Sequence, residues 1–147
     1  QNEVHNEDAN QLITKIEGDI LYLDPPYNAR QYGANYHLLN TLALYDIFEP
    51  KGKTGLRNYY RSAYCRKNQV RQVFEELIAQ ARFRFIFISY NNEGLMSLED
   101  MQEILSRYGH YDLFKQDYQR FKADRDANRQ HKAEITTEYL HVLEKRA

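Results

Sequence analysis

The sequence contains one cysteine, no tryptophan and only three prolines among its 147 residues. A single cysteine excludes an internal disulfide, and Cys65 has no neighbouring thiol with which to form a zinc site. We therefore expect no metal and a reducing compartment. No apolar run approaches the roughly 20 residues needed to cross a bilayer, and the polar N-terminus lacks the features of a signal peptide. These absences predict a cytoplasmic protein.

Glycine is also sparse, because the chain has six and they are scattered along it. None of them forms a glycine-rich loop of the kind that holds a phosphate or a cofactor. An excess of one charge is missing as well, since 20 Lys and Arg face 21 Asp and Glu, for a formal net charge of -1. Such a balance does not exclude nucleic acid as a partner, because it hides how the charges are distributed.

The composition is that of one globular domain with an apolar core: 42% of the residues are hydrophobic and 28% are charged. No internal repeat or low-complexity tract divides it, so we expect residues 1–147 to form a single domain. The chain begins with Gln1 rather than methionine. We interpret this as an indication of a fragment of a longer chain.

Two short apolar runs, residues 19–23 and 83–90, predict the main strands. Continuous apolar runs are typical of central parallel strands that are covered on both faces. Between them, apolar side chains recur at helical spacing from Val70 to Ala81, which predicts a helix that crosses from one strand to the next. Residues 36–46 are apolar on most sides, so we expect a second, buried helix there.

The rest of the chain adds one helix and two strands to this pattern. Ser97 to Asp100 resembles a capping box, and it predicts a helix over about 98–108 that ends at Gly109. Residues 111–121 and 135–145 are predicted to pair as an antiparallel hairpin. The expected fold class is therefore α/β, with parallel strands, helices and a C-terminal antiparallel hairpin.

The residues Asp24, Pro25, Pro26 and Tyr27 directly follow the first predicted strand, where open α/β sheets bind ligands. The prolines fix the backbone and remove two N–H donors, so the turn presents a carboxylate, backbone carbonyls and a ring. The exocyclic amine of a nucleobase needs acceptors for its N–H bonds to become a better nucleophile, and Asp24 and the Pro25 carbonyl can supply them. Taken alone, the four residues are equally well explained as a strand-ending turn.

The segment around this turn, DILYLDPPYNARQYGANYH, resembles the D12 class of adenine-N6-specific DNA methyltransferases of restriction-modification systems, and FISYNNEG and TTEYLHVLEK are similar to later strands of that family. The resemblance implies a partial Rossmann-like fold, S-adenosylmethionine as methyl donor and an adenine flipped out of duplex DNA as acceptor. It assigns Asp24 and Pro25 as acceptors of the amine, Pro26 as the rigid element and Tyr27 as the stacking partner.

Further contacts with DNA are expected on both sides of the predicted crossover helix. The residues beyond the turn that we expect to touch the target nucleotide or a phosphate are Asn28, Arg30, Gln31, Tyr32 and Tyr36. Residues 51–74 contain no acid and interleave tyrosines with basic side chains, as phosphate contact with stacking requires. The basic residues predicted to contact the DNA are Lys51, Lys53, Arg57, Arg61, Arg125 and Arg129. A solvated surface explains any single one of them nearly as well.

The family normally carries a Phe-x-Gly-x-Gly loop for the cofactor, and a target-recognition region, before the catalytic motif. Only 23 residues precede Asp24, and they contain no such loop. We therefore expect the C-terminal catalytic part of the enzyme, with Asp24 in an incomplete cofactor pocket and with little activity unaided. The expected partner is an N-terminal methyltransferase half, from the same gene or from a separate chain.

Two other interpretations fit the same residues. An RNA methyltransferase fragment that acts on an exocyclic amine would use a similar motif, although the residues after Tyr27 favour DNA adenine. A noncatalytic DNA-binding remnant of a truncated methyltransferase would keep the motif without the activity.

Overall fold

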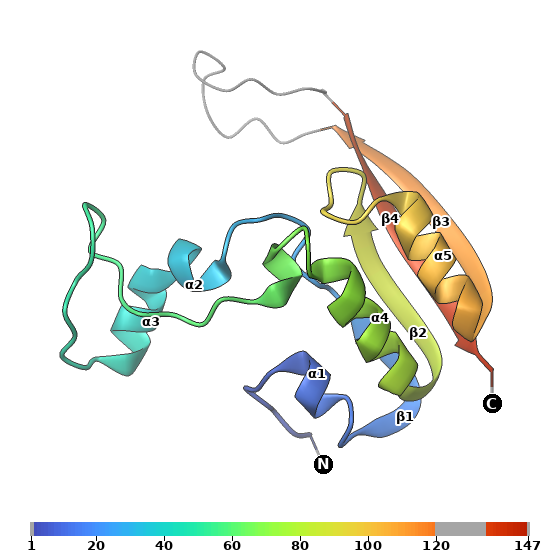
Figure 1. The fold of residues 1–147 in the computed structure, drawn as a ribbon, viewed down its shortest axis with the longest axis horizontal. Coiled ribbons are helices and arrows are strands. Elements are labelled where there is room, and N and C mark those ends of the chain that lie inside the picture. Colours follow the sequence, from blue (N-terminus) through green and yellow to red (C-terminus); the bar gives the residue numbers. More distant parts are fainter. Residues whose placement is uncertain (1, 120–134, 147) are drawn as a thin grey trace.

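The computed structural model describes residues 2–119 and 135–146. Four strands form one sheet in the order β1-β2-β4-β3 (Figure 1). β1 (Glu17–Leu23) runs parallel to β2 (Arg82–Asn91), while β4 (Ile135–Lys145) is antiparallel to both β2 and β3 (Gly109–Gln119). The α/β class and the antiparallel C-terminal pair are therefore confirmed.

The two helices that pack an apolar side on the sheet agree best with the helices predicted from the sequence. α4 (Val70–Gln80) connects β1 to β2, and α5 (Leu98–Tyr108) begins at the predicted capping box of Ser97 and Asp100. The shorter helical segments are α1 (Ala9–Leu12), α2 (Tyr32–Asn35), α3 (His37–Leu44) and the 3-10 turn η1 (Ala63–Cys65).

The core lies between the sheet and the two long helices, which cover the same face of it (Figure 1). Phe74 and Ile78 of α4, and Ile104 of α5, are fully buried against Ile86 and Ile88 of β2. Each such side chain contributes about 1.5–3 kcal/mol through the apolar area that it removes from water. This packing fixes β2 and, through it, the end of β1.

Lys145 of β4 closes the C-terminal end of α4. Its ammonium donates to the carbonyls of Ile78 at 2.8 Å, Ala79 at 2.9 Å and Ala81 at 2.5 Å. Ile78 and Ala79 lie in the last turn of α4, where no intrahelical N–H remains for their carbonyls, and Ala81 is the residue that follows the helix. The helix dipole favours a cation at this end.

Two expectations about strands and turns are wrong. β1 lies at the edge of the described sheet, and no described element covers the second face of β1 and β2. Gly109 does not end α5 in a left-handed conformation, because its φ is 175° and it is the first residue of β3. Glycine is needed there for close approach, since a Cβ would lie 2.0 Å from the backbone oxygen of Glu144.

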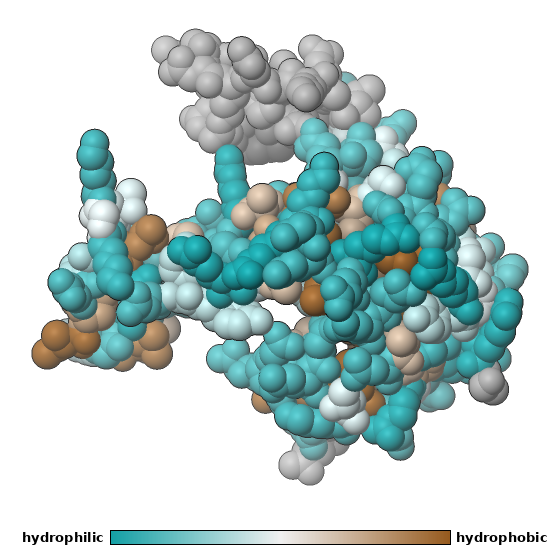
Figure 2. Space-filling view, viewed as in Figure 1, coloured by the Kyte–Doolittle hydropathy of each residue, from teal (hydrophilic) through white to brown (hydrophobic). Residues whose placement is uncertain are grey.

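The expected burial of the helix over 36–46 is also wrong. α3 has no buried residue, and it lies on an arm, residues 28–62, that projects away from the sheet (Figure 1). Leu42 is 72% exposed, and Ile47, beyond the helix, is fully exposed. Apolar surface gathers at the far end of the arm (Figure 2). Among the described residues, no helix is long and apolar enough to span a membrane.

Candidate active site

The turn Asp24 to Tyr27 lies at the carboxyl end of β1, as predicted. Leu23 is paired with Ile88, so the end of β1 lies beside the last residues of the parallel strand β2. The Asp24 side chain is exposed, the two prolines are half-buried, and Tyr27 is 40% exposed. The carboxylate and the ring are thus accessible from solvent, while the backbone that carries them is packed.

A second turn, residues 91–96 after β2, supports Tyr27. The N–H of Leu95 donates to the carbonyl oxygen of Tyr27 at 3.0 Å. Asn92 joins the same turn to β4, because its N–H donates to the carbonyl of Thr137 and its side-chain oxygen accepts from the N–H of Thr137, both at 3.1 Å. The candidate catalytic turn is therefore held to two further strands through one loop.

Gly94 permits the close approach of this loop to β2. A Cβ at residue 94 would lie 2.0 Å from Cε1 of the buried Tyr90 ring. The ring is held in place, because its hydroxyl accepts from the N–H of Met96 at 3.3 Å. The loop, rather than the ring, would have to move if a side chain were added.

Replacing Gly94 with alanine should therefore destabilise the fold by about 1–3 kcal/mol, the usual cost of overpacking. The loop should also shift away from Tyr27, because Leu95 follows the substituted residue. Urea unfolding measures the first effect, and hydrogen exchange at the Leu95 amide measures the second. Gly18→Ala is the matched control, since its Cβ would meet only the Phe83 ring, at 3.1 Å. Equal stability of the two variants would contradict this role of Gly94.

A cavity of about 340 Å³ opens beside Asp24. Its lining includes the apolar residues Leu23, Phe74 and Leu77 and the acidic residues Glu7 and Asp8. Tyr60 closes it and donates from its hydroxyl to Asp8 at 2.9 Å, a contact that, more than burial, raises the pKa of Tyr60. The cavity therefore combines apolar side chains with acidic residues next to the candidate catalytic carboxylate.

Tyr64 anchors α1, with its Asp8 cap, to the body of the domain. Its hydroxyl donates to the side-chain oxygen of Asn10 at 2.7 Å, and the Asn10 amide donates to the carbonyl of Val73 at 2.8 Å. Burial raises the pKa of Tyr64, which stays a neutral donor. Asp8 and Tyr60 were not predicted to line a pocket with Asp24. The sequence signals present were an acidic N-cap before a short helix and a tyrosine beside the basic stretch.

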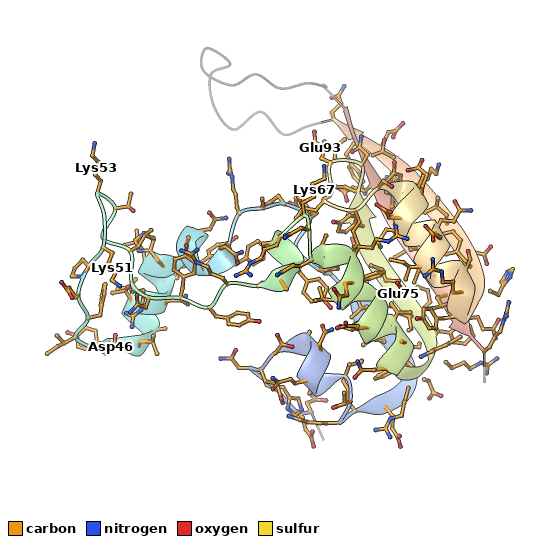
Figure 3. All side chains as sticks on the ribbon, viewed as in Figure 1. Asp46, Lys51, Lys53, Lys67, Glu75 and Glu93 are labelled. Atoms are coloured by element: carbon orange, nitrogen blue, oxygen red, sulfur yellow. The ribbon has the colours of Figure 1, made fainter. Side chains whose placement is uncertain are left out.

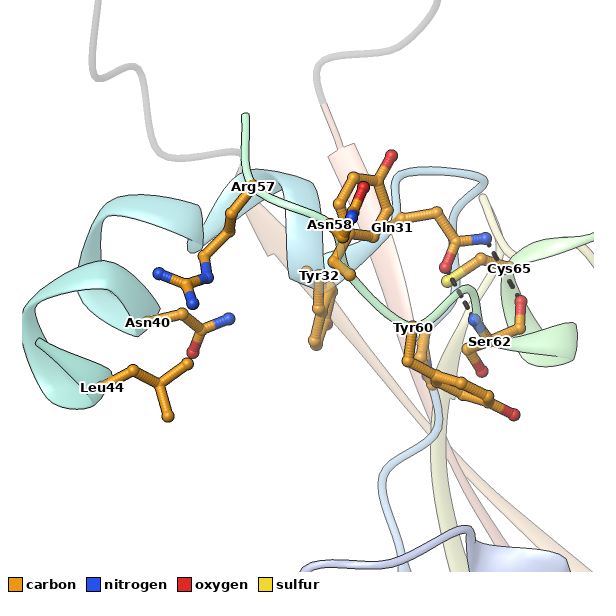
Figure 4. A pocket seen from close by; sticks show the side chains of 12 residues that line it. Gln31, Tyr32, Asn40, Leu44, Arg57, Asn58, Tyr60, Ser62 and Cys65 are labelled. Carbon is orange, nitrogen blue, oxygen red and sulfur yellow. Dashed lines mark hydrogen bonds between the residues drawn. The ribbon is translucent and has the colours of Figure 1, made fainter. Parts of the chain in front are cut away.

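The loop after the turn is clamped to the segment before η1 (Figure 4). The Gln31 side chain donates to the carbonyl of Ser62 at 3.2 Å and accepts from its N–H at 2.8 Å. The thiol of Cys65 donates to the carbonyl of Arg30 at 3.4 Å, and burial raises its pKa. Gln31 and Tyr32 line a second cavity of about 330 Å³ with Pro26. The Gln31 amide, predicted to touch the target nucleotide, is engaged in this clamp.

Tyr32, the first residue of α2, lies close enough to the candidate catalytic turn for Tyr27 and Asp24 to affect its ionisation. Burial, followed by the neighbouring Tyr27 and Asp24, raises the pKa of its phenol. Its ring meets the Tyr36 ring edge-on, with centroids 5.7 Å apart. Asn28 accepts from the N–H of Arg30 at 2.9 Å, so it shapes the loop. Tyr32 and Tyr36 therefore form an aromatic pair beside the turn, each about half exposed.

The basic residues that were predicted to contact DNA differ in their exposure and in their ion pairs. Lys51 and Lys53 lie on the arm, with Lys53 directed outward at its tip (Figure 3), and Arg61 is exposed beside the Tyr59 ring. Arg57 differs, because its guanidinium is only 9% exposed, binds both Asp46 oxygens at 2.7 and 2.8 Å and lies 4.5 Å from the centre of the Phe48 ring. This pairing organises the arm and leaves Arg57 poorly placed for a phosphate. Arg125 and Arg129 lie outside the described residues.

The comparisons with known proteins place the chain in one family. The model of the family described as D12 class N6 adenine-specific DNA methyltransferase matches residues 1–104. The Type II methyltransferase M.NlaIII of Neisseria lactamica is 66% identical over 143 residues, which cover 97% of this chain and 43% of the relative.

Two further relatives show the same partial coverage. M.FokI of Planomicrobium okeanokoites is 47% identical over 98% of this chain and 22% of its own length. M.CviAII of Paramecium bursaria Chlorella virus 1 is 44% identical over 82% of this chain and 36% of its own. No solved structure matches the chain. The chain thus spans less than half the length of each of these three relatives.

Proposed function

Because the chain belongs to the D12 class of N6 adenine-specific DNA methyltransferases, we propose that it carries the catalytic turn of an enzyme that methylates N6 of an adenine in duplex DNA. The enzyme uses S-adenosylmethionine, acts in the cytoplasm and needs the remainder of a methyltransferase chain for full activity. The observation that supports this most directly is the accessible Asp24 carboxylate at the end of β1, on a backbone anchored through Tyr27 and Leu95.

The proposed mechanism makes the weakly nucleophilic N6 amine of adenine able to attack a methyl group. Its nitrogen lone pair is delocalised into the ring, so the nitrogen is a poor nucleophile until acceptors hold its N–H bonds. Asp24 and the Pro25 carbonyl would accept hydrogen bonds from these two N–H groups. The lone pair is then free to attack the methyl carbon, whose bond to the sulfonium sulfur breaks and leaves a neutral thioether. The Asp24 carboxylate then receives the proton that the nitrogen loses. Tyr27 stacks on the flipped base, which contributes on the order of 1–3 kcal/mol.

The cavity beside Asp24 is suited to the methyl donor. Its apolar wall, which includes Leu23 and Phe74, fits an adenine ring, and the carboxylates of Glu7 and Asp8 are acceptors for amine or ribose hydroxyl groups. When bound, S-adenosylmethionine supplies an electrophilic methyl group on a cationic sulfur, and the negative charge of Asp24 is favourable next to that cation. The cavity is small and open, which supports an incomplete pocket that the rest of the enzyme completes.

The proposal is tested by reconstitution. This chain is coexpressed with the part of M.NlaIII outside the 143 matched residues, and the product is given S-adenosylmethionine with a labelled methyl group and either duplex DNA or RNA. We expect label on N6 of adenine in DNA only. Label in RNA would favour the RNA methyltransferase interpretation, and no label with a stable complex would favour the noncatalytic remnant.

Calorimetry of this chain alone with S-adenosylmethionine tests the incomplete pocket separately. We expect binding weaker than about 1 mM, because a small open cavity recovers little of the cost of ordering a ligand. Micromolar binding by the isolated chain would contradict an incomplete pocket while leaving the proposed chemistry intact.

The basic arm should contribute to DNA affinity through Lys53 and Arg61. Replacing both with glutamate is expected to weaken binding at low salt and to reduce the slope of log K against log salt by about 2, because each phosphate contact contributes about 0.9. Fluorescence anisotropy with a labelled duplex over a salt series measures this slope.

The control for this variant makes the same change of charge at the opposite end of the sheet. Arg82 and Arg146 are exposed there, and their replacement with glutamate should leave the slope nearly unchanged. Arg57 is left intact because its reversal would break the pair with Asp46. An unchanged slope in the Lys53 and Arg61 variant would refute a role of the arm in DNA binding.

A further inference from the structure

Tyr60 connects the arm to the cavity beside Asp24. It lies near the end of the arm, next to Arg61, one of the two basic residues proposed above to contribute to DNA affinity. Its hydroxyl donates to Oδ2 of Asp8 at 2.9 Å, across 52 positions of sequence. Among the described residues, no other hydrogen bond joins the arm to residues 2–16. The contact therefore links a segment with a proposed role in DNA binding to a residue of the cofactor cavity.

The Asp8 carboxylate has few acceptor positions left. Its Oδ1 caps α1 and already accepts from the N–H groups of Asn10 at 2.9 Å and Gln11 at 3.3 Å. A carboxylate has about four acceptor positions in all. The two cap bonds and the Tyr60 bond together fix the orientation of the carboxylate and leave about one position, on Oδ2, for a bound ligand. An amine or a ribose hydroxyl of S-adenosylmethionine is a donor of the required kind.

The segment that carries Tyr60 also lies between the two cavities. Tyr60, Ser62 and Pro26 line both the cavity beside Asp24 and the second cavity, whose other lining residues belong mostly to the arm. Two residues after Tyr60, the backbone of Ser62 is clamped by the side chain of Gln31 (Figure 4). A change in the position of this segment would therefore alter the cavity beside Asp24.

The hydrogen bond between Tyr60 and Asp8 is exposed to solvent in the chain alone. Because Tyr60 is 71% exposed, water competes for both partners and the net contribution of the bond is small. A DNA backbone bound at Arg61 would lie next to Tyr60 and would exclude water from this contact. A hydrogen bond is stronger where water is excluded, so bound DNA would stabilise the oriented Asp8 carboxylate.

We infer that Tyr60 is a positioning residue for S-adenosylmethionine, which orients the Asp8 carboxylate for the cofactor and makes cofactor binding and DNA binding cooperative. The inference rests on the proposed function, because both ligands belong to it. DNA that orders the segment around Arg61 strengthens the contact of Tyr60, and the oriented Asp8 then binds the cofactor more tightly. By thermodynamic linkage, the cofactor raises the affinity for DNA by the same factor.

The test measures this coupling in the reconstituted enzyme. Calorimetry gives the affinity for S-adenosylhomocysteine, the cofactor without its methyl group, with and without duplex DNA, so that no methyl transfer occurs. In the unsubstituted enzyme we expect DNA to raise this affinity about tenfold, within the usual range of coupling between two sites. Tyr60→Phe keeps the ring and removes the hydroxyl. It should change the DNA-free affinity by no more than about twofold, because the exposed bond contributes little, and it should abolish the effect of DNA.

Two further variants separate the hydroxyl of Tyr60 from a general effect on the arm. Tyr45→Phe is the matched control, since Tyr45 lies on the same arm, is 93% exposed and makes no side-chain hydrogen bond among the described residues. It should keep the full effect of DNA. Asp8→Asn keeps the cap of α1 and alters the acceptor of the hydroxyl. In that background, adding Tyr60→Phe should lower the affinity in the presence of DNA no further, because both changes act on one contact.

Several results would overturn the inference. These are an undiminished effect of DNA in Tyr60→Phe, a further loss in the double variant, and tighter DNA-free binding in Tyr60→Phe, which would mean that Tyr60 competes with the cofactor for Asp8. An unsubstituted enzyme that does not bind S-adenosylhomocysteine, or whose affinity for it is unchanged by DNA, would do so too. Methylation of N6 with coupling intact in Tyr60→Phe would reject the role of Tyr60 and retain the proposed function. Coupling that depends on Tyr60 without methylation would do the reverse.

Discussion

Replacing Asp24 with asparagine is expected to lower the rate of methyl transfer in the reconstituted enzyme by on the order of 10³-fold. Asparagine keeps the shape of the side chain but replaces an acceptor oxygen with an N–H donor, which would face the N–H of the adenine amine. The loss of one well-placed polar partner in a reacting site typically costs 10²–10³-fold, and loss of the proton acceptor adds to it. Single-turnover transfer of labelled methyl groups to duplex DNA measures the rate.

The same substitution should leave the fold and DNA affinity nearly unchanged, because the Asp24 side chain is exposed. Asp19→Asn is the matched control, since Asp19 is an exposed aspartate on β1, the strand that Asp24 follows. It should retain the full rate. A rate within tenfold of the unsubstituted enzyme for Asp24→Asn would exclude Asp24 as the amine acceptor, whereas parallel loss of folding would make the residue structural.

Lowering the pH from 7 to 4 should remove about 3 kcal/mol of stability through His141 alone. The ring is fully buried in β4, and burial lowers its pKa to about 4, from an ordinary value near 6.5. Between these values the unfolded chain binds a proton that the folded chain does not. The free energy of unfolding is therefore highest above about pH 6.5 and falls as the pH drops toward 4.

The surroundings of His141 explain why it stays neutral. Its Nδ1 lies 2.9 Å from the hydroxyl of Tyr111, a phenol whose own pKa is raised to about 12 by burial. Its Nε2 has no hydrogen-bond partner in the part of the chain that the structure describes. Neither ring nitrogen of His141 therefore has a negatively charged partner that would stabilise the imidazolium. Protonation of the ring consequently favours the unfolded chain.

Urea unfolding at a series of pH values, with His141→Leu as the comparison, measures this contribution. The variant lacks the titrating ring, so its stability should fall by about 3 kcal/mol less over the same range. His110→Gln serves as control, because the His110 side chain is 74% exposed and should show no such difference. Identical pH profiles for the unsubstituted chain and His141→Leu would disprove the assignment.

Local patterns were sufficient for the elements that pack on the sheet. The spacing of Val70, Phe74 and Ile78 defines both a helix and its buried side, and the Ser97 capping box defines where α5 begins. The same reasoning failed for residues 36–46, because an apolar helix indicates a buried one only if something packs on it. Whether another segment packs on α3 depends on residues distant in the sequence, so composition could not determine it.

In the candidate site, too, features set by neighbouring residues could be predicted, whereas features formed by residues distant in the sequence could not. Asp24 to Tyr27 could be located from the strand before them, since the end of an apolar run marks the edge of a sheet. The cavity could not, because Tyr60 meets Asp8 across 52 positions of sequence. Gly109 looked like a helix terminator, whereas its small size serves the backbone of Glu144 on a strand that follows much later.

The contact between Lys145 and α4 makes the order of synthesis matter for this fold. The carbonyl of Ile78 accepts a hydrogen bond from Lys145, which lies 67 positions further along the chain and is therefore synthesised later. A nascent chain that has produced only β1, α4 and β2 therefore has a helix whose C-terminal carbonyls can bond only to water. The parallel strand pair that carries Asp24 gains this part of its stability only after β4 has joined the sheet. Proteolysis of stalled nascent chains should consequently cut near residue 80 until Lys145 has left the ribosome.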